Sequence, residues 1–466
     1  MKSTIHKIEI IVLALVVIAV FAITHYYYSS SLLQQVKSEG EIIIITRNSP
    51  STYYIGNEGP TGFEYELAEQ FAEYLGVRLA IIVQNEFHQI LPALVNGKAH
   101  IGAAGITHTR QREAYVDFGP DYHKIVSQVA YRGGQQKPKT IEDLQNKRVA
   151  VIQGSTHAQM LLDHKEFFPL LDWNEYPGLS TEDLIHLVSD GLIDYTIADS
   201  NELALNRRYF PKLRIGFNLG PEQSLAWAFQ KSEDTSLQNA AKMFFAQISD
   251  DGTLAKLKEK YFGHVNSISP ADSHAFIRNV KKRLPKYERI FKEAALEFDM
   301  DWRFLAAVSY QESLWNSNAI SPTGVKGLMM LTRTTAKQLK IENRVDPLNS
   351  VLGGTEYYLT MREKIPARIA DPDRTWFALA AYNVGFGHLE DARILTQRAG
   401  GNPDLWLDVR KYLPLLSKKK WYEKTRFGYA RGQEPVVYVQ NIRNYFDLLV
   451  WLENKGELYE LFAQNT

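Results

Sequence analysis

The hydrophobic pattern of the chain changes once, between residues 262 and 273, and this change limits its possible folds more than any other feature. From Glu41 to about Tyr261, β-rich runs alternate with helical ones, as in "EIIIITRN", "FEYELAEQFAEYLGV", "RLAIIVQ" and "KRVAVIQG". Such alternation is typical of α/β layers. From about Ala271 onward the strands fade, and helical stretches such as "DWRFLAAVSYQESLW" dominate. Because the stretch between them is rich in Ser, Pro and Gly, we predict an α/β domain over 41–262 and a mainly α domain over 274–466.

The composition supports a multidomain globular protein and excludes several kinds of site. At 466 residues the chain exceeds the roughly 150 residues of one ordinary domain. Lys plus Arg and Asp plus Glu number 53 each, so charge gives no support for a nucleic-acid partner. The run "SKKKWYEKTR" at 417–426 is a local basic patch, which we interpret as a solvated surface. The absence of cysteine removes disulfides, thiolate metal sites and cysteine nucleophiles, and we expect neither a metal nor a cofactor.

The N-terminus predicts export. "MKSTIHK" supplies a positive flank, and an uninterrupted apolar run follows from Ile10 to Ile23. Counted from Ile8 to Tyr28, the stretch is near the roughly 20 residues that span a membrane, and tyrosines stand where an interfacial belt would lie. Since no clear small-x-small cleavage site follows, residues 1–30 are interpreted as a signal peptide or an uncleaved membrane anchor.

Three polar features of the α/β domain predict a small zwitterionic ligand. Arg110 and Arg112 follow an apolar strand, where a guanidinium can bind a carboxylate through two hydrogen bonds. "VAVIQGSTHAQML" reads as a strand, a Gly-Ser-Thr turn and a helix, so the N–H groups of 154–156 face any anion at the helix start. Asp199 ends the strand "DYTIAD" and is a candidate counter-ion for an ammonium. Each feature alone also has an ordinary structural explanation, such as a surface ion pair or a helix cap.

Their order and spacing resemble the periplasmic amino-acid-binding proteins over roughly residues 41–262. The matching stretches are "GFEYELAEQFAEYLGV", "LVNGKAHIGAAGITHTRQREAYVDFG" and "RVAVIQGST". The resemblance implies two α/β lobes that close over a ligand, and it selects Arg112 rather than Arg110 to bind the ligand carboxylate. The other ligand positions that it implies are Gly105, Thr107, Ser155 and Asp199. Glu66 and "DFGP" depart from the usual "G-[FY]-x-x-D" and "DFSxP", so the ligand is left open between an amino acid and a cell-wall-derived, muropeptide-like molecule.

A single glutamate lies on the apolar face of a predicted helix in the second domain. Leu305, Val308 and Glu312 stand at i, i+3 and i+7, so the carboxylate shares the face meant for the core. Burial raises the pKa of a carboxyl group, which then holds a proton near neutral pH and can act as a general acid. Glycosidases that hydrolyse normally add a second carboxylate, and Glu434 in "EPVVYVQNI" is the only candidate in a motif-like context. The alternative is a surface glutamate whose helical phase differs by one residue.

Residues from about 285 to 460 resemble the catalytic domain of the soluble lytic transglycosylases. The matching stretches are "ESLWNSNAISPTGVKGLMMLTRTTA", "AYNVGFGHL" and "EPVVYVQNI", with "GLMM" where the family more often has "GLMQ". The resemblance implies a lysozyme-like helical fold with Glu312 as its single acid/base. Such enzymes protonate the glycosidic oxygen after N-acetylmuramic acid and then deprotonate the C6 hydroxyl of that sugar, which attacks C1. The substrate-binding positions that the resemblance implies are Ser313, Ser321, Gly327, Met329, Tyr382, Asn383, Glu434 and Tyr438.

Together these features predict a multidomain lyase: a two-lobed α/β periplasmic-binding-protein fold followed by a mainly α, lysozyme-like domain. It would cleave the β-1,4 bond of peptidoglycan between N-acetylmuramic acid and N-acetylglucosamine, leave 1,6-anhydro ends, and sense a small ligand through its first domain. Its expected place is the periplasmic side of the cell envelope, on the outer membrane by resemblance or on an inner-membrane anchor. Two alternatives are a non-catalytic ligand sensor that docks on the wall and a lysozyme-type hydrolase.

Overall fold

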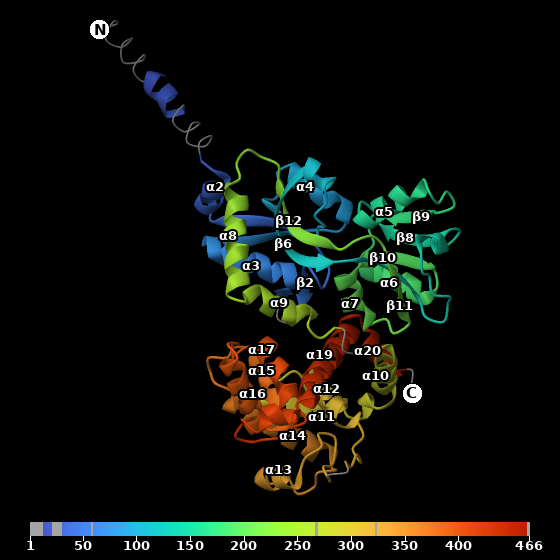
Figure 1. Cartoon of the computed structure of the whole chain (residues 1–466), viewed down its shortest axis with the longest axis vertical. Coiled ribbons are helices and arrows are strands. Elements are labelled where there is room, and N and C mark those ends of the chain that lie inside the picture. The colour runs from blue at the N-terminus through green and yellow to red at the C-terminus, as the bar shows by residue number, and fades with distance from the viewer. Residues whose placement is uncertain (1–12, 21–29, 57–58, 266–268, 322–323, 464–466) are drawn as a thin grey trace.

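The computed structural model describes residues 13–20, 30–56, 59–265, 269–321 and 324–463. An α/β region of two lobes lies above a helical region in Figure 1. Residues 13–20 are helical, but the rest of the predicted signal or anchor, 1–12 and 21–29, lies outside the described residues. Within the described ranges we find no helix that combines the length and the apolar character needed to cross a membrane.

The first lobe is a five-stranded sheet in the order β4-β1-β5-β12-β6. The strands β4, β1 and β5 are parallel, whereas β12 runs antiparallel to both β5 and β6. The elements of this lobe are α2 (Leu32–Glu39), β1 (Glu41–Arg47), β2 (Tyr54–Gly56), β3 (Gly59–Thr61), α3 (Phe63–Leu75), β4 (Arg78–Gln84), α4 (Ile90–Val95), β5 (Ile101–Gly102), β6 (Val116–Ile125), β12 (Gln223–Gln230), α8 (Ser236–Asp250) and α9 (Thr253–Phe262), with 3-10 turns η1 (Phe87–Gln89) and η2 (Arg112–Ala114).

The second lobe has its own five-stranded sheet, in the order β11-β7-β10-β8-β9. Its elements are β7 (Ser127–Arg132), η3 (Ile141–Leu144), β8 (Val149–Ile152), α5 (Thr156–Lys165), β9 (Trp173–Tyr176), α6 (Thr181–Asp190), β10 (Tyr195–Asp199), α7 (Ser200–Arg207) and β11 (Leu213–Asn218). The chain passes between the lobes twice, from β6 to β7 and from β11 to β12. The prediction of a two-lobed α/β fold is therefore confirmed.

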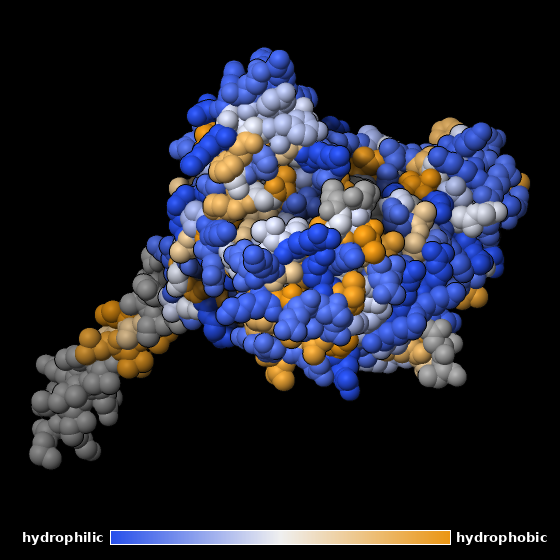
Figure 2. Space-filling view, turned by 90° about the horizontal axis from the view of Figure 1, so that it is seen from below, coloured by the Kyte–Doolittle hydropathy of each residue, from blue (hydrophilic) through white to orange (hydrophobic). Residues whose placement is uncertain are grey.

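The remaining elements are helical, as predicted. They are α10 (Pro270–Lys282), η4 (Leu284–Lys286), α11 (Glu288–Phe298), α12 (Trp302–Ser313), α13 (Arg333–Gln338), α14 (Pro347–Lys364), α15 (Asp373–Val384), α16 (Phe386–Arg398), α17 (Trp406–Tyr412), η5 (Leu413–Ser417), α18 (Lys419–Tyr422), α19 (Gln433–Asn454) and α20 (Glu457–Ala463). The first of them begins at Pro270, before the expected start at 274, because Ser269 caps it and proline suits the first helical position. Seen from below, the surface is mostly hydrophilic with small scattered apolar groups (Figure 2).

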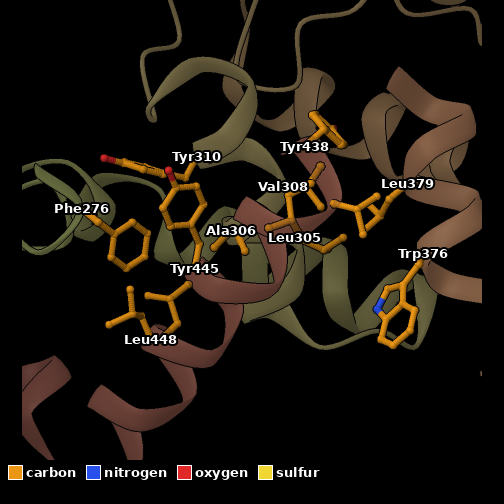
Figure 3. Packing of buried hydrophobic residues seen from close by; sticks show 14 of the residues in the cluster. Phe276, Leu305, Ala306, Val308, Tyr310, Trp376, Leu379, Tyr438, Tyr445 and Leu448 are labelled. Atoms are coloured by element: carbon orange, nitrogen blue, oxygen red, sulfur yellow. The ribbon is translucent and has the colours of Figure 1, made fainter. Parts of the chain in front are cut away.

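The core of the helical region is built around α12 and α19. Leu305, Ala306 and Val308 of α12 are buried and pack among side chains of α15 and α19 (Figure 3). Phe276 and Tyr445 stack with centroids 4.8 Å apart, and Tyr310 meets both rings edge-on. Aromatic packing of this kind adds stability beyond the area that it buries. The position of α12, and with it that of Glu312, is therefore fixed by the core.

The helix α19 also contacts both lobes of the α/β region. Asp447 accepts a hydrogen bond from Arg208 of the second lobe and lies 2.6 Å from His264 Nε2. Trp451 stacks on Tyr209 with centroids 4.9 Å apart and an interplanar angle of 9°. Burial lowers the pKa of His264 to about 3, so its ring is neutral. Burial opposes ionisation of Asp447 as well, but Arg208 and His264 outweigh it and hold the pKa of this carboxyl well below its ordinary value.

A second ionic cluster joins α19 to the end of the first lobe. Arg443 and Arg410 both donate to Glu259 Oε1, at 3.1 and 2.8 Å. The Arg443 guanidinium also lies 4.0 Å from the centre of the Trp376 ring. Because a buried charge is costly when it loses its partner, these pairs oppose separation of the two regions. The α/β region and the helical region thus share an interface of buried charges and stacked rings.

Candidate active site and ligand cleft

The predicted acid, Glu312, lies in the last turn of α12. Leu305 and Val308 are buried as expected, and Glu312 is half-buried at the end of the same stripe. The helix stops abruptly after it, because Leu314 and Trp315 both adopt positive φ angles, 53° and 56°. Trp315 is fully buried, and its indole N–H donates to the Ala306 carbonyl oxygen at 2.8 Å. This bond stabilises an otherwise unfavourable turn next to the carboxylate.

Tyrosines surround the carboxyl group. The Tyr438 hydroxyl of α19 donates to Glu312 Oε1 at 2.6 Å, and the Tyr382 ring stacks beside Tyr438 with centroids 6.4 Å apart. Burial raises the pKa of Glu312 to about 7, although the Tyr438 hydrogen bond acts in the opposite direction. The pKa values of both tyrosines are raised well above the ordinary value, first by burial and then by the Glu312 charge. Glu312 is therefore able to exchange a proton near neutral pH, as a general acid/base must.

The loop that follows Glu312 is held by the protein's own hydrogen bonds. The buried Ser313 hydroxyl donates to the Leu328 carbonyl oxygen at 2.9 Å. Met329 is fully buried; its carbonyl oxygen accepts from the Tyr382 hydroxyl at 2.8 Å, and its N–H donates to Ser350 Oγ at 3.1 Å. The predicted substrate residues Ser313 and Met329 thus support the site from inside, while Tyr382 connects this loop to α15.

The remaining predicted substrate positions differ in exposure. Gly327 has a φ of +88°, and a Cβ there would lie 1.9 Å from the Arg344 carbonyl oxygen, so the protein's own packing requires glycine. Ser321 is half-buried, and its Oγ accepts from Val325 N–H at 3.2 Å. Asn383 is exposed at the end of α15. Glu434 is also exposed and lies 3.3 Å from Arg431 Nη1.

This position of Glu434 bears on the search for a second carboxylate. Its side chain is 58% exposed and pairs with a neighbouring arginine rather than with Glu312. In the part of the chain that the structure describes, the polar partner of Glu312 is Tyr438, and no ion pair or hydrogen bond joins Glu312 to another carboxylate. The arrangement suits a reaction that uses one carboxyl group for both proton transfers.

The predicted ligand residues of the α/β region meet between the lobes. Arg112 is buried whereas Arg110 is exposed, and the Phe87 ring lies 5.6 Å below the Arg112 guanidinium. Arg112 donates to the Thr107 carbonyl oxygen at 3.0 Å and, across the cleft, to that of Gly154 at 3.3 Å. Burial lowers the pKa of Arg112 to about 10, against the influence of Asp199. Its guanidinium therefore remains charged at neutral pH and has no carboxylate as a direct partner among its described contacts.

Four other predicted positions line the same cavity, whose volume is only ≈ 20 Å³. They are Gly105, Thr107, Ser155 and Asp199. Ser155 caps α5, since its hydroxyl accepts from Ala158 N–H at 3.3 Å, and Asp199 lies 3.0 Å from His157 Nε2. The residues that the sequence grouped thus line one cavity, and the structure shows a cleft closed to less than the volume of an amino acid.

Sequence reasoning missed the groups that close this cleft. Glu202 of the second lobe reaches Arg47 Nη2 at 3.1 Å and Ser49 Oγ at 3.0 Å in the first lobe. Glu64 accepts from Gly105 N–H at 3.0 Å, and burial raises its pKa to about 8. These residues come from four separate segments, so no local spacing could have grouped them. One local pattern did indicate that Glu64 is buried. In "FEYELAEQF" this residue stands three and four positions before Leu67 and Ala68, so it lies on the buried face of the same helix.

Comparisons with known proteins agree with this division. Residues 42–264 match the bacterial extracellular solute-binding proteins, family 3, and residues 289–404 match the transglycosylase SLT domain. The membrane-bound lytic murein transglycosylase F of Pseudomonas fluorescens strain Pf-5 is 46% identical over 423 residues, covering 91% of this chain and 87% of that protein. The chain belongs to the membrane-bound lytic murein transglycosylase F family.

Another member of the membrane-bound lytic murein transglycosylase F family, from Saccharophagus degradans strain 2-40, is 46% identical over 433 residues, which are 93% of this chain and 86% of that protein. Among solved structures, an arginine-binding protein variant of T. maritima is 25% identical, covers 50% of this chain and 99% of its own, and has a TM-score of 0.46. The predictions of a lytic transglycosylase and of its two-part architecture are confirmed by the family.

Proposed function

We propose that Glu312 is the single acid/base of a peptidoglycan lytic transglycosylase. The observation that carries this assignment is a carboxyl group with a pKa raised to about 7, hydrogen-bonded by Tyr438 and joined to no second carboxylate among the described residues. The protonated Glu312 gives its proton to the glycosidic oxygen as the bond from C1 of N-acetylmuramic acid to that oxygen breaks. The resulting carboxylate then takes the proton of the C6 hydroxyl while O6 bonds to C1.

This sequence of steps needs no water and returns Glu312 to its protonated form. A nucleophile within the same sugar acts at a very high effective concentration, which explains how the enzyme works without a second carboxylate. Tyr438 holds the carboxyl group in place and stabilises its charged form between the two proton transfers. Exposed Asn383 and the rim of the 313–331 loop are the proposed contacts for the glycan.

For the α/β region we propose a small ligand that carries a carboxylate, either an amino acid or a muropeptide-like molecule. Support comes from Arg112, a buried cation, and from Asp199 on the opposite lobe, a candidate partner for an ammonium. A cavity of ≈ 20 Å³ requires the lobes to separate before such a ligand enters. Opening must break the pair of Arg47 with Glu202 and the hydrogen bond from Arg112 to the Gly154 carbonyl oxygen.

We further propose that the protein works on the periplasmic side of the cell envelope. The printed names of its relatives describe them as membrane-bound. The apolar run from Ile10 to Ile23 behind a positive flank supports attachment through the N-terminus. An outer-membrane location follows the family resemblance, and an inner-membrane anchor is the alternative.

The function is tested by mass spectrometry of purified peptidoglycan after digestion with the full chain. We expect products ending in 1,6-anhydro-N-acetylmuramic acid, and Glu312→Gln should lower their release at least about 100-fold, the range for losing acid–base help. Glu363→Gln, an exposed position on α14, is the matched control and should cut normally. Reducing ends in place of anhydro ends would show a hydrolase of the lysozyme type, and an unchanged rate in Glu312→Gln would refute the assignment of the acid.

A further inference from the structure

The surface segment 417–430 combines charge and exposed aromatic rings beside the predicted active site. It contains five cationic residues and one acidic residue, a net charge of +4 in a chain whose overall net charge is +0. Lys419 pairs with Glu423 at 3.6 Å. The other four cations are exposed, and the described contacts give none of them an acidic partner; they are Lys418, Lys420, Lys424 and Arg426. An unneutralised cluster of this kind favours an anionic partner.

Exposed aromatic rings accompany the charges. Phe427 is 51% exposed and Tyr429 is 57% exposed. The Arg426 guanidinium lies over the Phe427 ring at 5.4 Å, and Tyr422 meets Tyr429 edge-on with centroids 5.8 Å apart. Clusters of exposed rings next to cations are more typical of binding surfaces than of ordinary solvated faces.

The protein holds this segment in a defined place. Buried Asp391 of α16 accepts from the backbone N–H groups of Arg426 and Phe427, at 3.0 and 2.8 Å. Arg398 donates to the Lys424 carbonyl oxygen at 3.2 Å, and Ala430 N–H donates to Leu416 O at 3.1 Å. Charge-assisted bonds to a buried carboxylate are among the stronger ones in proteins. The segment is therefore an ordered platform.

The platform, residues 417–430, contacts elements that adjoin the predicted glycan site. A Cβ at Gly387 would lie 2.7 Å from the Phe427 ring, so this ring packs directly on the first turn of α16, the helix that follows Tyr382 and Asn383. On the other side, α19 begins at Gln433 and carries Tyr438, the partner of Glu312. The platform thus lies between the start of α16, which directly follows the helix of Tyr382, and the start of α19, which carries Tyr438.

The location also favours the substrate over a membrane as the anionic partner. The platform belongs to the helical region, next to α16 and α17 at the lower left in Figure 1. The chain enters the α/β region at α2, on the side of that region away from the helices (Figure 1). The described start of the first lobe at α2 therefore lies at the opposite end of the protein from the platform.

We propose that the platform 417–430 binds the carboxylates of the peptides that branch from the glycan strand, as an accessory substrate site. This proposal rests on the proposed function, because it assumes that the strand lies across Glu312. Lys418, Lys420, Lys424 and Arg426 supply positive charge to the peptide carboxylates, and the rings of Phe427 and Tyr429 pack on the apolar parts of the same peptides. The site distinguishes peptide-bearing strands from strands without peptides.

The test compares two substrates of equal length, glycan strands with their peptides and strands stripped of them by an amidase. The full chain is compared with a variant in which Lys418, Lys420, Lys424 and Arg426 are all changed to Gln. The matched control changes four exposed lysines of the α/β region, Lys98, Lys137, Lys147 and Lys212, to Gln. Thermal unfolding of all three proteins verifies that each is folded.

We expect the platform variant to raise KM for peptide-bearing strands about 10-fold, since four exposed charge contacts are lost, and to leave kcat unchanged. KM for stripped strands and all values of the control should stay within about twofold. Added salt should raise KM of the wild type more for peptide-bearing strands than for stripped strands, which keep only the lactyl carboxylate of each N-acetylmuramic acid. Equal KM changes on both substrates, or none, would overturn the proposal. Selective loss of binding to phosphatidylglycerol vesicles would assign the platform to a membrane instead. If the wild type cleaves neither substrate, the proposed function itself fails.

Discussion

Replacing Glu312 by Gln should stabilise the protein at neutral and alkaline pH but not near pH 4.5. Burial raises the pKa of Glu312 from 4.5 to about 7. A carboxyl group whose pKa is higher in the folded state binds more protons when folded, so the free energy of unfolding falls as pH rises from about 4.5 to about 7. Gln carries no such proton and keeps an oxygen that can accept from the Tyr438 hydroxyl.

The size of the effect follows from the shift. A difference of about 2.5 pH units, at 1.36 kcal/mol per unit, corresponds to a penalty of about 3 kcal/mol at pH 8.5. At pH 4.5 the carboxyl group is protonated in the folded state and half protonated in the unfolded state, so the penalty is below about 0.5 kcal/mol. For a helical domain of this size, about 3 kcal/mol corresponds to a rise in Tm of roughly 6–12 °C.

Calorimetry of the full chain and of Glu312→Gln at pH 4.5 and pH 8.5 measures this difference. We expect the variant to exceed the wild type in Tm at pH 8.5 and to match it at pH 4.5. Glu363→Gln should change Tm little at either pH, because an exposed side chain has little to lose. A rise in Tm of equal size at both pH values would refute the argument that burial raises the pKa of the Glu312 carboxyl group.

Four further predictions concern residues around the two sites. Tyr438→Phe removes the hydrogen bond that favours the Glu312 carboxylate, so the alkaline limb of the pH–rate profile should move up by about one pH unit; an unmoved limb would show that the bond is unimportant. Glu434→Gln should change the cleavage rate less than about threefold, because Glu434 is exposed and pairs only with Arg431; a loss near that of Glu312→Gln would assign it a proton-transfer role. Arg112→Ala should abolish binding of carboxylate ligands in a calorimetric screen of amino acids and cell-wall peptides, and Arg110→Ala should weaken it far less; equal losses would contradict the burial argument. A wall-derived peptide should alter the rate of anhydro-product release by the full chain, and Arg112→Ala should remove this response while basal activity stays; a rate indifferent to every bound ligand would make the α/β region a tether.

The sequence predicted most of the architecture because its signals there are local. Alternation such as "EIIIITR" became β1, with alternating burial at its start, and the stripe of Leu305 and Val308 led to Glu312 at the end of α12. The hydrogen bond from Tyr438 and the contact of Arg47 with Glu202 could not be predicted, because they join residues more than 100 positions apart. The resemblance named Ser313 and Met329 as substrate-binding positions, and only the fold shows that both are buried and make hydrogen bonds within the protein.

The place of α19 in the chain has a consequence for biosynthesis. This helix, Gln433–Asn454, supplies Tyr438 to Glu312 and Asp447 to Arg208, so both contacts depend on residues that the ribosome adds after the α/β lobes and after α12. Domains fold as units while synthesis proceeds from the N-terminus. The α/β lobes are therefore complete while the catalytic carboxyl group still lacks its hydrogen-bond donor. A nascent or truncated chain that ends before residue 433 therefore carries the acid without the tyrosine that donates to it.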